Sequence, residues 1–164
     1  MAEYPVMFTV RDTVSGNGFL AGVTLTGRAI MVEEDGKWWM YGVRPSAIAE
    51  SGENPGEAFL RFRTSYKNVL FDFAEGAADY KGFRDTVEGF YLQPHQEEEN
   101  RWMDAFRAIR TGEVAPEPPF FSGLPKEDPL TRPAQISVER LDKPTARYTS
   151  SDNVTDNLLM AKAA

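Results

Sequence analysis

The sequence contains no cysteine and a single histidine, His95. The lack of cysteine excludes disulfide bonds, thiolate catalysis and zinc sites with sulfur ligands, so burial of side chains has to stabilise the fold. Acid–base and nucleophilic enzymes need a base that ionises near neutral pH, most often histidine. His95 follows Pro94 and precedes a run of glutamates, which is typical of an exposed loop or a helix entry; a pH-sensitive contact and a role in a site are the alternatives. The sequence therefore predicts that the protein is not an enzyme.

Motifs that bind phosphate or metal ions are also missing. The glycines at 16 and 18 lack the third glycine and the strand-to-helix setting of a dinucleotide-binding loop, and no Gly-Lys-Ser/Thr of a P-loop occurs. The acidic runs 33–35 and 97–99 lack the spacing of a metal-binding loop, because neighbouring side chains on a strand or a helix point in different directions. We therefore expect no catalytic residue, no cofactor and no metal ion.

Neither a basic block nor a long apolar run is present. The chain carries 18 Lys and Arg against 25 Asp and Glu, for a net charge of −7. Nucleic-acid binders draw much of their affinity from Lys and Arg, so this balance argues against an extensive nucleic-acid interface and favours a basic protein partner. No segment approaches the roughly 18 apolar residues of a membrane helix, and no signal-peptide pattern is present. We expect no membrane association and a cytoplasmic location.

Proline is unevenly spread along the chain. Eight of the eleven prolines follow residue 93, whereas aromatic residues, at 12% of the sequence, are plentiful enough to form a core. This distribution predicts a sheet-plus-helix core over residues 1–75, a helical insertion or extension over 76–111, and a proline-rich extended tail over 112–164. Within the tail, only residues 135–141 alternate in the manner of a strand.

The first 43 residues predict a three-stranded antiparallel meander. Apolar residues at Val6, Phe8 and Val10 alternate with others, which places them on one face of a strand. Turn residues at 15–18 and 34–37 include glycines that permit a chain reversal. The third strand, Trp38–Val43, is bulky on both faces, so we expect it to be central in the sheet or covered on both sides.

Three helices are expected after the meander. Asn54 is suited to cap the first, with Pro55 in its opening turn, and apolar residues then recur every three or four positions up to Phe73. Weaker helical patterns cover residues 80–91 and 96–110. The predicted fold class is α+β: an antiparallel three- to four-stranded sheet packed by one main helix, two further helices, and a long proline-rich extended C-terminal tail.

Large apolar side chains in three places are candidates for binding a partner. Trp39 and Tyr41 are of the types that anchor interfaces, with core packing as the alternative explanation. Phe120 and Phe121 lie in a proline-bound segment that cannot bury both locally, so they dock either on this domain or on a partner. A short apolar group also follows the polar run 149–155; such tails often order on binding, with plain disorder as the alternative. The candidate partner-binding residues are Trp39, Tyr41, Phe120, Phe121, Leu158, Leu159 and Met160.

Residues 30–73 combine an acidic strand end and glycine turn, an aromatic strand, Pro45, a small-residue strand at 47–52 and a helix that opens at Asn54. This order resembles the HicB-like antitoxin domain, a shortened and catalytically silent relative of the RNase H fold. In that family three strands, a helix and a further strand follow one another, and residues 135–141 correspond to the last strand. The chain departs from the family in lacking a Leu-Pro-Gly stretch, and residues 76–111 are an insertion.

The resemblance implies that the protein neutralises a small RNA-cleaving toxin by covering it. The DNA-binding role of many family members is not expected, because no helix-turn-helix or ribbon-helix-helix segment follows Leu141. We therefore expect a non-catalytic protein-binding module, antitoxin-like or inhibitor-like, with a homo-oligomer as a further option. The alternative is a structural subunit of a larger assembly whose tail straps neighbouring subunits.

Overall fold

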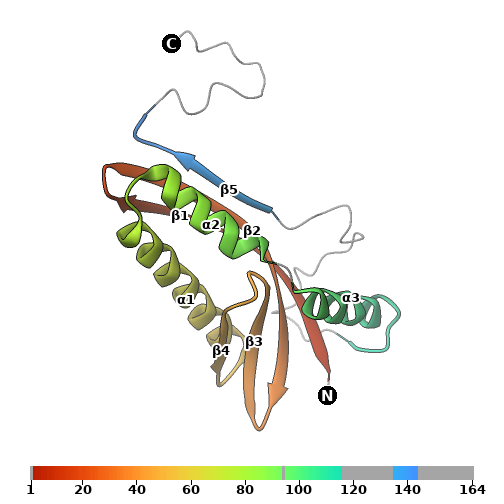
Figure 1. Ribbon diagram of the computed structural model, residues 1–164. Coiled ribbons are helices and arrows are strands. Elements are labelled where there is room, and N and C mark those ends of the chain that lie inside the picture. The colour runs from red at the N-terminus through yellow and green to blue at the C-terminus, as the bar shows by residue number, and fades with distance from the viewer. Residues whose placement is uncertain (1, 94, 116–134, 144–164) are drawn as a thin grey trace.

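The computed structural model describes residues 2–93, 95–115 and 135–143. The strands are β1 (Glu3–Gly16), β2 (Phe19–Glu34), β3 (Lys37–Arg44), β4 (Ala49–Gly52) and β5 (Gln135–Arg140), and the helices are α1 (Pro55–Gly76), α2 (Tyr80–Leu92) and α3 (Gln96–Arg110). The predicted α+β class, with an antiparallel sheet and three helices, is confirmed (Figure 1). Of the predicted tail, residues 116–134 and 144–164 lie outside the described part of the chain.

One long strand organises the sheet. β1 pairs with β2 along its whole length, from Glu3 opposite Val32 to Gly16 opposite Phe19. The other edge of β2 is shared: β3 pairs with residues 28–34 and β5 with residues 21–26. β4 pairs with β3 at the far side of the sheet. Every pairing is antiparallel, and β1 and β2 form the long curved hairpin seen in Figure 1.

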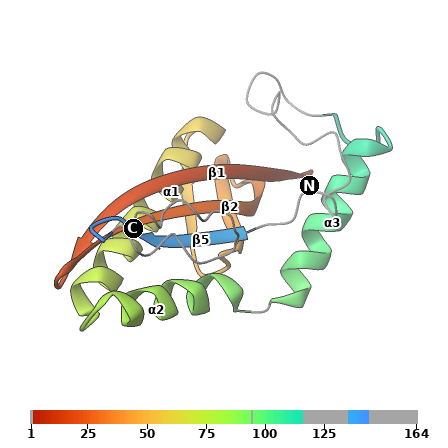
Figure 2. The same cartoon turned by 90° about the horizontal axis from the view of Figure 1, so that it is seen from above.

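Alternation of side chains along the strands creates a core on each face of the sheet. The larger core joins inward residues such as Val14 and Leu25 with the buried stripe of α1 and with α2. The smaller core lies on the opposite face, where Ile30 and Val43 pack against Trp102 of α3. Figure 2 shows α3 near the N-terminus, away from α1 and α2. β3 is thus internal in the sheet and contributes to both cores, as its bulky sequence predicts.

The cap predicted at Asn54 is confirmed by its hydrogen bond, and α2 also begins with a capped turn. The Asn54 side chain accepts a hydrogen bond from the Glu57 amide at 2.9 Å, and the Glu57 carboxylate in turn accepts one from the Glu53 amide at 2.8 Å. Asp79 caps α2 in the same way, by accepting from the Gly82 amide. These bonds satisfy amides that have no partner within the helix. No helix among the described residues is both long and apolar enough to cross a membrane.

An ion triad holds α3 against the sheet. Glu99 accepts hydrogen bonds from Arg28 Nη1 at 3.2 Å and from Arg44 Nε at 2.7 Å. Arg28 is only 9% exposed, and its guanidinium lies 4.7 Å from the centre of the Trp102 ring. The two arginines sit on β2 and β3, so a single carboxylate of α3 is bonded to two adjacent strands.

Replacing Glu99→Ala is expected to lower the free energy of unfolding by about 2–3 kcal/mol, because two partly buried guanidinium groups lose their acidic partner. The effect should fall short of the roughly 3–5 kcal/mol typical of fully buried pairs, since the Glu99 side chain keeps 16% exposure. Urea unfolding measures the change. The matched control is Glu97→Ala, an exposed acid in the same helical turn, which should cost below about 1 kcal/mol. Equal losses in the two variants would contradict the role of the triad.

Candidate protein-interaction surface

Trp39 and Tyr41 form a stacked pair on one face of β3. Their ring centroids are 5.6 Å apart and the ring planes differ by 10°. Both side chains are half-buried. The strand partners of these residues on β4 are Ser51 and Ala49, which lie on the same face of the sheet. Because these two side chains are small, they leave part of the aromatic pair open to solvent. We call Trp39 and Tyr41 the aromatic platform.

Contacts from β2 and α3 hold Tyr41 of the aromatic platform in place, and β1 supports the contact from α3. The Tyr41 hydroxyl donates a hydrogen bond of 2.7 Å to Glu34 Oε1 at the end of β2. Arg101 of α3 lies over the Tyr41 ring, with its guanidinium carbon 5.9 Å from the ring centre. Arg101 is itself bound to Glu3 of β1 through two hydrogen bonds of 2.9 and 2.7 Å. A pair of rings ordered in this way loses little conformational freedom when a partner binds.

The surroundings of Tyr41 raise the pKa of its hydroxyl. Burial raises the pKa of the Tyr41 hydroxyl above its ordinary value, and the hydrogen bond to Glu34 and the charge of Glu34 raise it further, while Arg101 acts in the opposite direction. Tyr41 is therefore a neutral hydrogen-bond donor at physiological pH. The pKa of Arg101 is raised mainly by its hydrogen bond to Glu3, so that the guanidinium stays charged.

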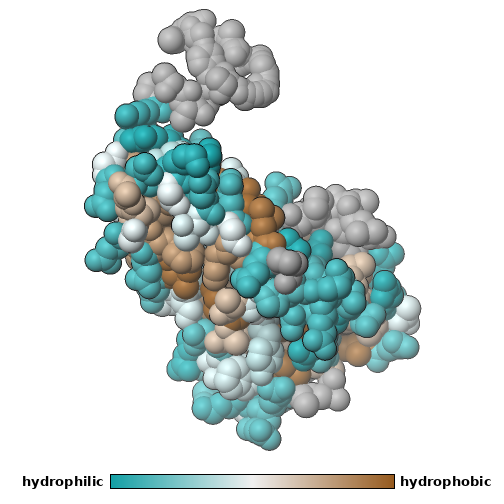
Figure 3. Space-filling model, viewed as in Figure 1, coloured by the Kyte–Doolittle hydropathy of each residue, from teal (hydrophilic) through white to brown (hydrophobic). Residues whose placement is uncertain are grey.

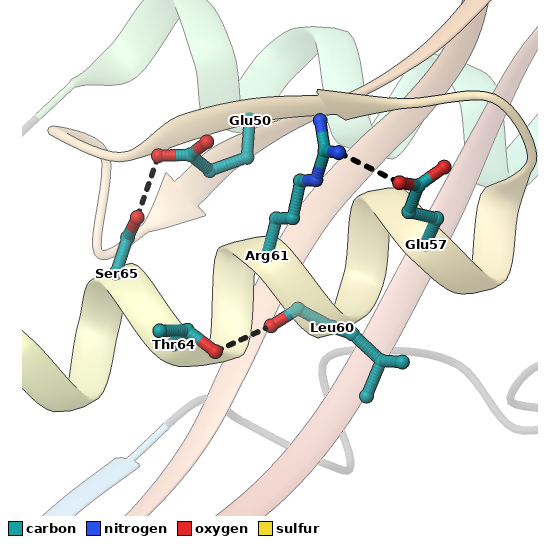
Figure 4. A pocket seen from close by; sticks show the side chains of 6 residues that line it. All are labelled: Glu50, Glu57, Leu60, Arg61, Thr64 and Ser65. Atoms are coloured by element: carbon teal, nitrogen blue, oxygen red, sulfur yellow. Dashed lines mark hydrogen bonds and ion pairs between the residues drawn. The ribbon is translucent and has the colours of Figure 1, made fainter.

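The opposite side of β4 borders a groove against α1. The groove has a volume of about 320 Å³, and the residues that line it are Glu50, Glu57, Leu60, Arg61, Thr64 and Ser65. Figure 4 shows Arg61 reaching from α1 across to β4, and Glu50 turned toward Ser65. Elsewhere, on the face seen in Figure 3, hydrophobic residues are exposed only in narrow patches between hydrophilic ones. The platform on β3 and the groove beside Glu50 of β4 thus lie on opposite faces of the sheet, since Glu50 pairs with Met40 of the larger core.

The structure brings together only two of the residues predicted to bind a partner. Trp39 and Tyr41 meet on the surface, whereas their neighbour Trp38 turns to the larger core and packs against Tyr4 at 6.0 Å between ring centroids. The other candidates lie outside the described residues: Phe120, Phe121, Leu158, Leu159 and Met160.

Sequence reasoning missed the groove and the residues that support the platform. Glu3 and Arg101 are far apart along the chain, and no local pattern links them. The signal that was present for the groove is Leu60, which is 64% exposed and lies off the apolar stripe of α1.

Other chemical groups in the described residues do not converge on this surface. His95 stands at the start of α3, where its Nδ1 lies 3.5 Å from Glu98 Oε1, and it borders neither the platform nor the groove. Within residues 2–93, 95–115 and 135–143, no group of three His, Asp or Glu is arranged to hold a metal ion.

Replacing Glu34→Gln is expected to lower the pKa of Tyr41 toward its ordinary value of 10.0, because the phenol loses both an acceptor and a neighbouring negative charge. A raised folded-state pKa stabilises the fold below the unfolded value, and this contribution is lost as pH rises through the folded value. Titration by NMR of ring-labelled tyrosine measures the shift. Glu33→Gln, at the exposed neighbouring position, is the control and should leave the Tyr41 titration unchanged; a shift of equal size there would argue against the Glu34 contact.

Comparison with known proteins gives no assignment for the chain. The resemblance of residues 30–73 to the HicB-like antitoxin domain accordingly stays a prediction. Any proposal about function has to depend on the geometry of the platform and the groove. No family model, no curated protein and no solved structure matches this sequence.

Proposed function

We propose that the protein is a non-catalytic binding module that occludes a partner protein through the aromatic platform. The observation that carries this proposal is the stacked, half-exposed pair Trp39 and Tyr41, held by Glu34 and Arg101. Tryptophan, tyrosine and arginine are the residue types that contribute most to binding energy at protein interfaces. A preordered cluster of all three on a sheet surface supports recognition of a protein rather than turnover of a substrate.

The charge around the platform favours a basic partner. Glu33 and Asp35 are exposed at the turn between β2 and β3, beside the platform, and the whole chain has a net charge of −7. Complementary charge accelerates association and disfavours acidic competitors. The acids at this turn would steer a basic surface toward the two rings.

A small RNA-cleaving toxin in the cytoplasm fits this description. Such a protein has to bind an anionic substrate, so its active face is basic, and an acidic surface carrying an aromatic anchor can cover that face. The resemblance of residues 30–73 to the HicB-like antitoxin domain supports the same class of partner. The role proposed is inhibition by occlusion.

A structural subunit of a larger assembly, and a homo-oligomer, are the competing assignments. A structural subunit would strap its neighbours with a tail formed mainly by residues outside those described. The contacts of the described residues favour neither the structural subunit nor the homo-oligomer. Both are outcomes that the following experiment distinguishes from inhibition.

Replacing Trp39→Ala is expected to weaken binding of the captured partner about 30-fold, which corresponds to a loss of about 2 kcal/mol at an interface anchor. Affinity capture with the tagged chain supplies the partner, and calorimetry measures the dissociation constant. Because Trp39 is only half-buried, the melting temperature should change by no more than a few degrees. Leu92→Ala, at a residue 56% exposed on α2, is the control and should bind normally.

The inhibitory role is tested with the same purified proteins. If the partner cleaves RNA, cleavage should stop on mixing with the unaltered chain and persist with the Trp39→Ala variant. Undiminished binding by Trp39→Ala would remove the platform from the interface. Several stoichiometric partners with no inhibited activity would point to the structural subunit, and a chain that elutes as an assembly of itself alone would point to the homo-oligomer.

A further inference from the structure

The outer edge of β4 carries backbone groups that face away from the sheet. β4 is the last strand in the order β1-β2-β3-β4, and no other strand of the described residues pairs with it. The Gly42 amide donates to Ile48 O at 2.8 Å, which marks Gly42 and Ile48 as a hydrogen-bonded pair. Antiparallel pairs alternate between bonded and non-bonded, so Met40 bonds to Glu50, and Ala49 and Ser51 direct their N–H and C=O groups outward.

Arg61 confirms this direction. Its Nη1 donates a hydrogen bond of 3.0 Å to Ser51 O, from the side of β4 that is away from β3. Its Nη2 is bound at 2.7 Å to Glu57 Oε2, one turn earlier on α1. The Arg61 side chain is 55% exposed, so it covers the strand edge while remaining in contact with solvent. A charged side chain across an open edge is a common way to prevent unwanted pairing of strands.

The groove beside this edge has room for an extended chain. It lies between β4 and α1 and has a volume of about 320 Å³. Leu60 offers an apolar contact there that is 64% exposed, and Thr64 and Ser65 line the same side. A segment added to β4 would continue the sheet and place alternate side chains over the groove, which is the geometry of strand addition.

The charged residues at the β4 edge indicate the sign of the charge that a bound segment would carry. Glu50 accepts a hydrogen bond from Ser65, and no Lys or Arg of the described residues forms an ion pair with it. Glu53 and Glu57 add two more acidic side chains near the N-terminal end of α1. The basic side chain that pairs with Glu57 there is Arg61. A second copy of this edge would bring like charges together, whereas a lysine or arginine would complement Glu50.

We propose that the β4 edge and its groove bind an extended, basic segment of a partner protein by strand addition. In this complex a Lys or Arg side chain pairs with Glu50, an apolar side chain two residues away packs on Leu60, and Arg61 releases Ser51 O to an amide of the incoming strand. The inference goes beyond the aromatic platform of β3, since it uses the free edge of β4, the groove against α1 and a backbone mode of recognition.

The test is an NMR titration of the labelled chain with a short blocked peptide in which lysine and valine alternate with threonine. Binding is expected to shift the amide signals of residues 49–52 and to slow hydrogen exchange of the Ser51 amide. Two control peptides distinguish strand addition from other modes of binding. One carries glutamate for lysine and should not bind; the other keeps the lysines but has proline at its centre, lacks an amide there, and should bind at least tenfold more weakly.

Two variants of the chain test how much the charge of Glu50 contributes to binding of the peptide. Glu50→Gln should weaken the lysine peptide about threefold, as expected for a partly solvated ion pair. Glu75→Gln removes an exposed acid near the other end of α1 and should leave the affinity unchanged. Equal weakening in both variants, or shifts without protection of the Ser51 amide, would mean that the peptide is attracted by overall charge, and would overturn the proposal.

Failure of strand addition can be distinguished from failure of the platform as a binding site. If Trp39→Ala abolishes capture of the partner while the peptide leaves residues 49–52 undisturbed, strand addition is wrong and the platform stands. If the peptide binds β4 as described while Trp39→Ala captures the partner normally, the platform is wrong and strand addition stands. Pairing of β4 with a second copy of the chain at high concentration would also overturn the proposal, because the occupant would then be acidic.

Discussion

The hydrogen-bond ladder along β2 is the constraint on which the rest of the structure depends. This strand pairs with β1 on one edge and with both β3 and β5 on the other. Its residues Ile30 and Met31 point to opposite faces and are 1% and 0% exposed. A strand buried on both sides has to be apolar at consecutive positions, as residues 29–32 of β2 are. The larger core and the smaller core are therefore built on one continuous segment of chain.

This constraint also determines where a partner can be bound. β3 pairs with only the last part of β2, and β4 pairs with β3, so the platform and the groove both lie at the end of the sheet formed by the last part of β2. Arg28 and Arg44, bound to Glu99, fix α3 at that end. Arg101 of the same helix then reaches the Tyr41 ring. Two surfaces of different chemistry thus have a common rigid support.

Local patterns in the sequence were sufficient for most elements of the fold. Alternation located β1 and β5, a bulky run between turn residues located β3, and the capping residue Asn54 located the start of α1, because each signal is contained within a few neighbouring positions. The pairing of β5 with residues 21–26 was not predicted, since alternation shows that a strand exists but not which edge it joins. The same limit applies to Glu99, whose two arginine partners lie 71 and 55 residues away.

The candidate site was only partly accessible to the same reasoning. The sequence indicated Trp39 and Tyr41, but core packing was the competing explanation for them, because alternation does not reveal which face of a strand is covered. Trp38, one position earlier, does turn to the larger core. The groove depends on the position of β4 relative to α1, and Arg61 links the two elements through a bond to a carbonyl ten residues earlier.

The separate attachment of β5 to β2 has a mechanical consequence. At the end of β5, the Leu141 amide donates to Leu20 O at 2.7 Å, the Leu20 amide donates to Asp142 Oδ1 at 3.2 Å, and Arg140 Nη2 donates to Gly18 O at 2.8 Å. Tension applied to the chain beyond Lys143 is borne first by these bonds. The ladder between β2 and β3 uses other residues of β2, so the hydrogen bonds that bear this load are not shared with the strands that carry the platform and the groove.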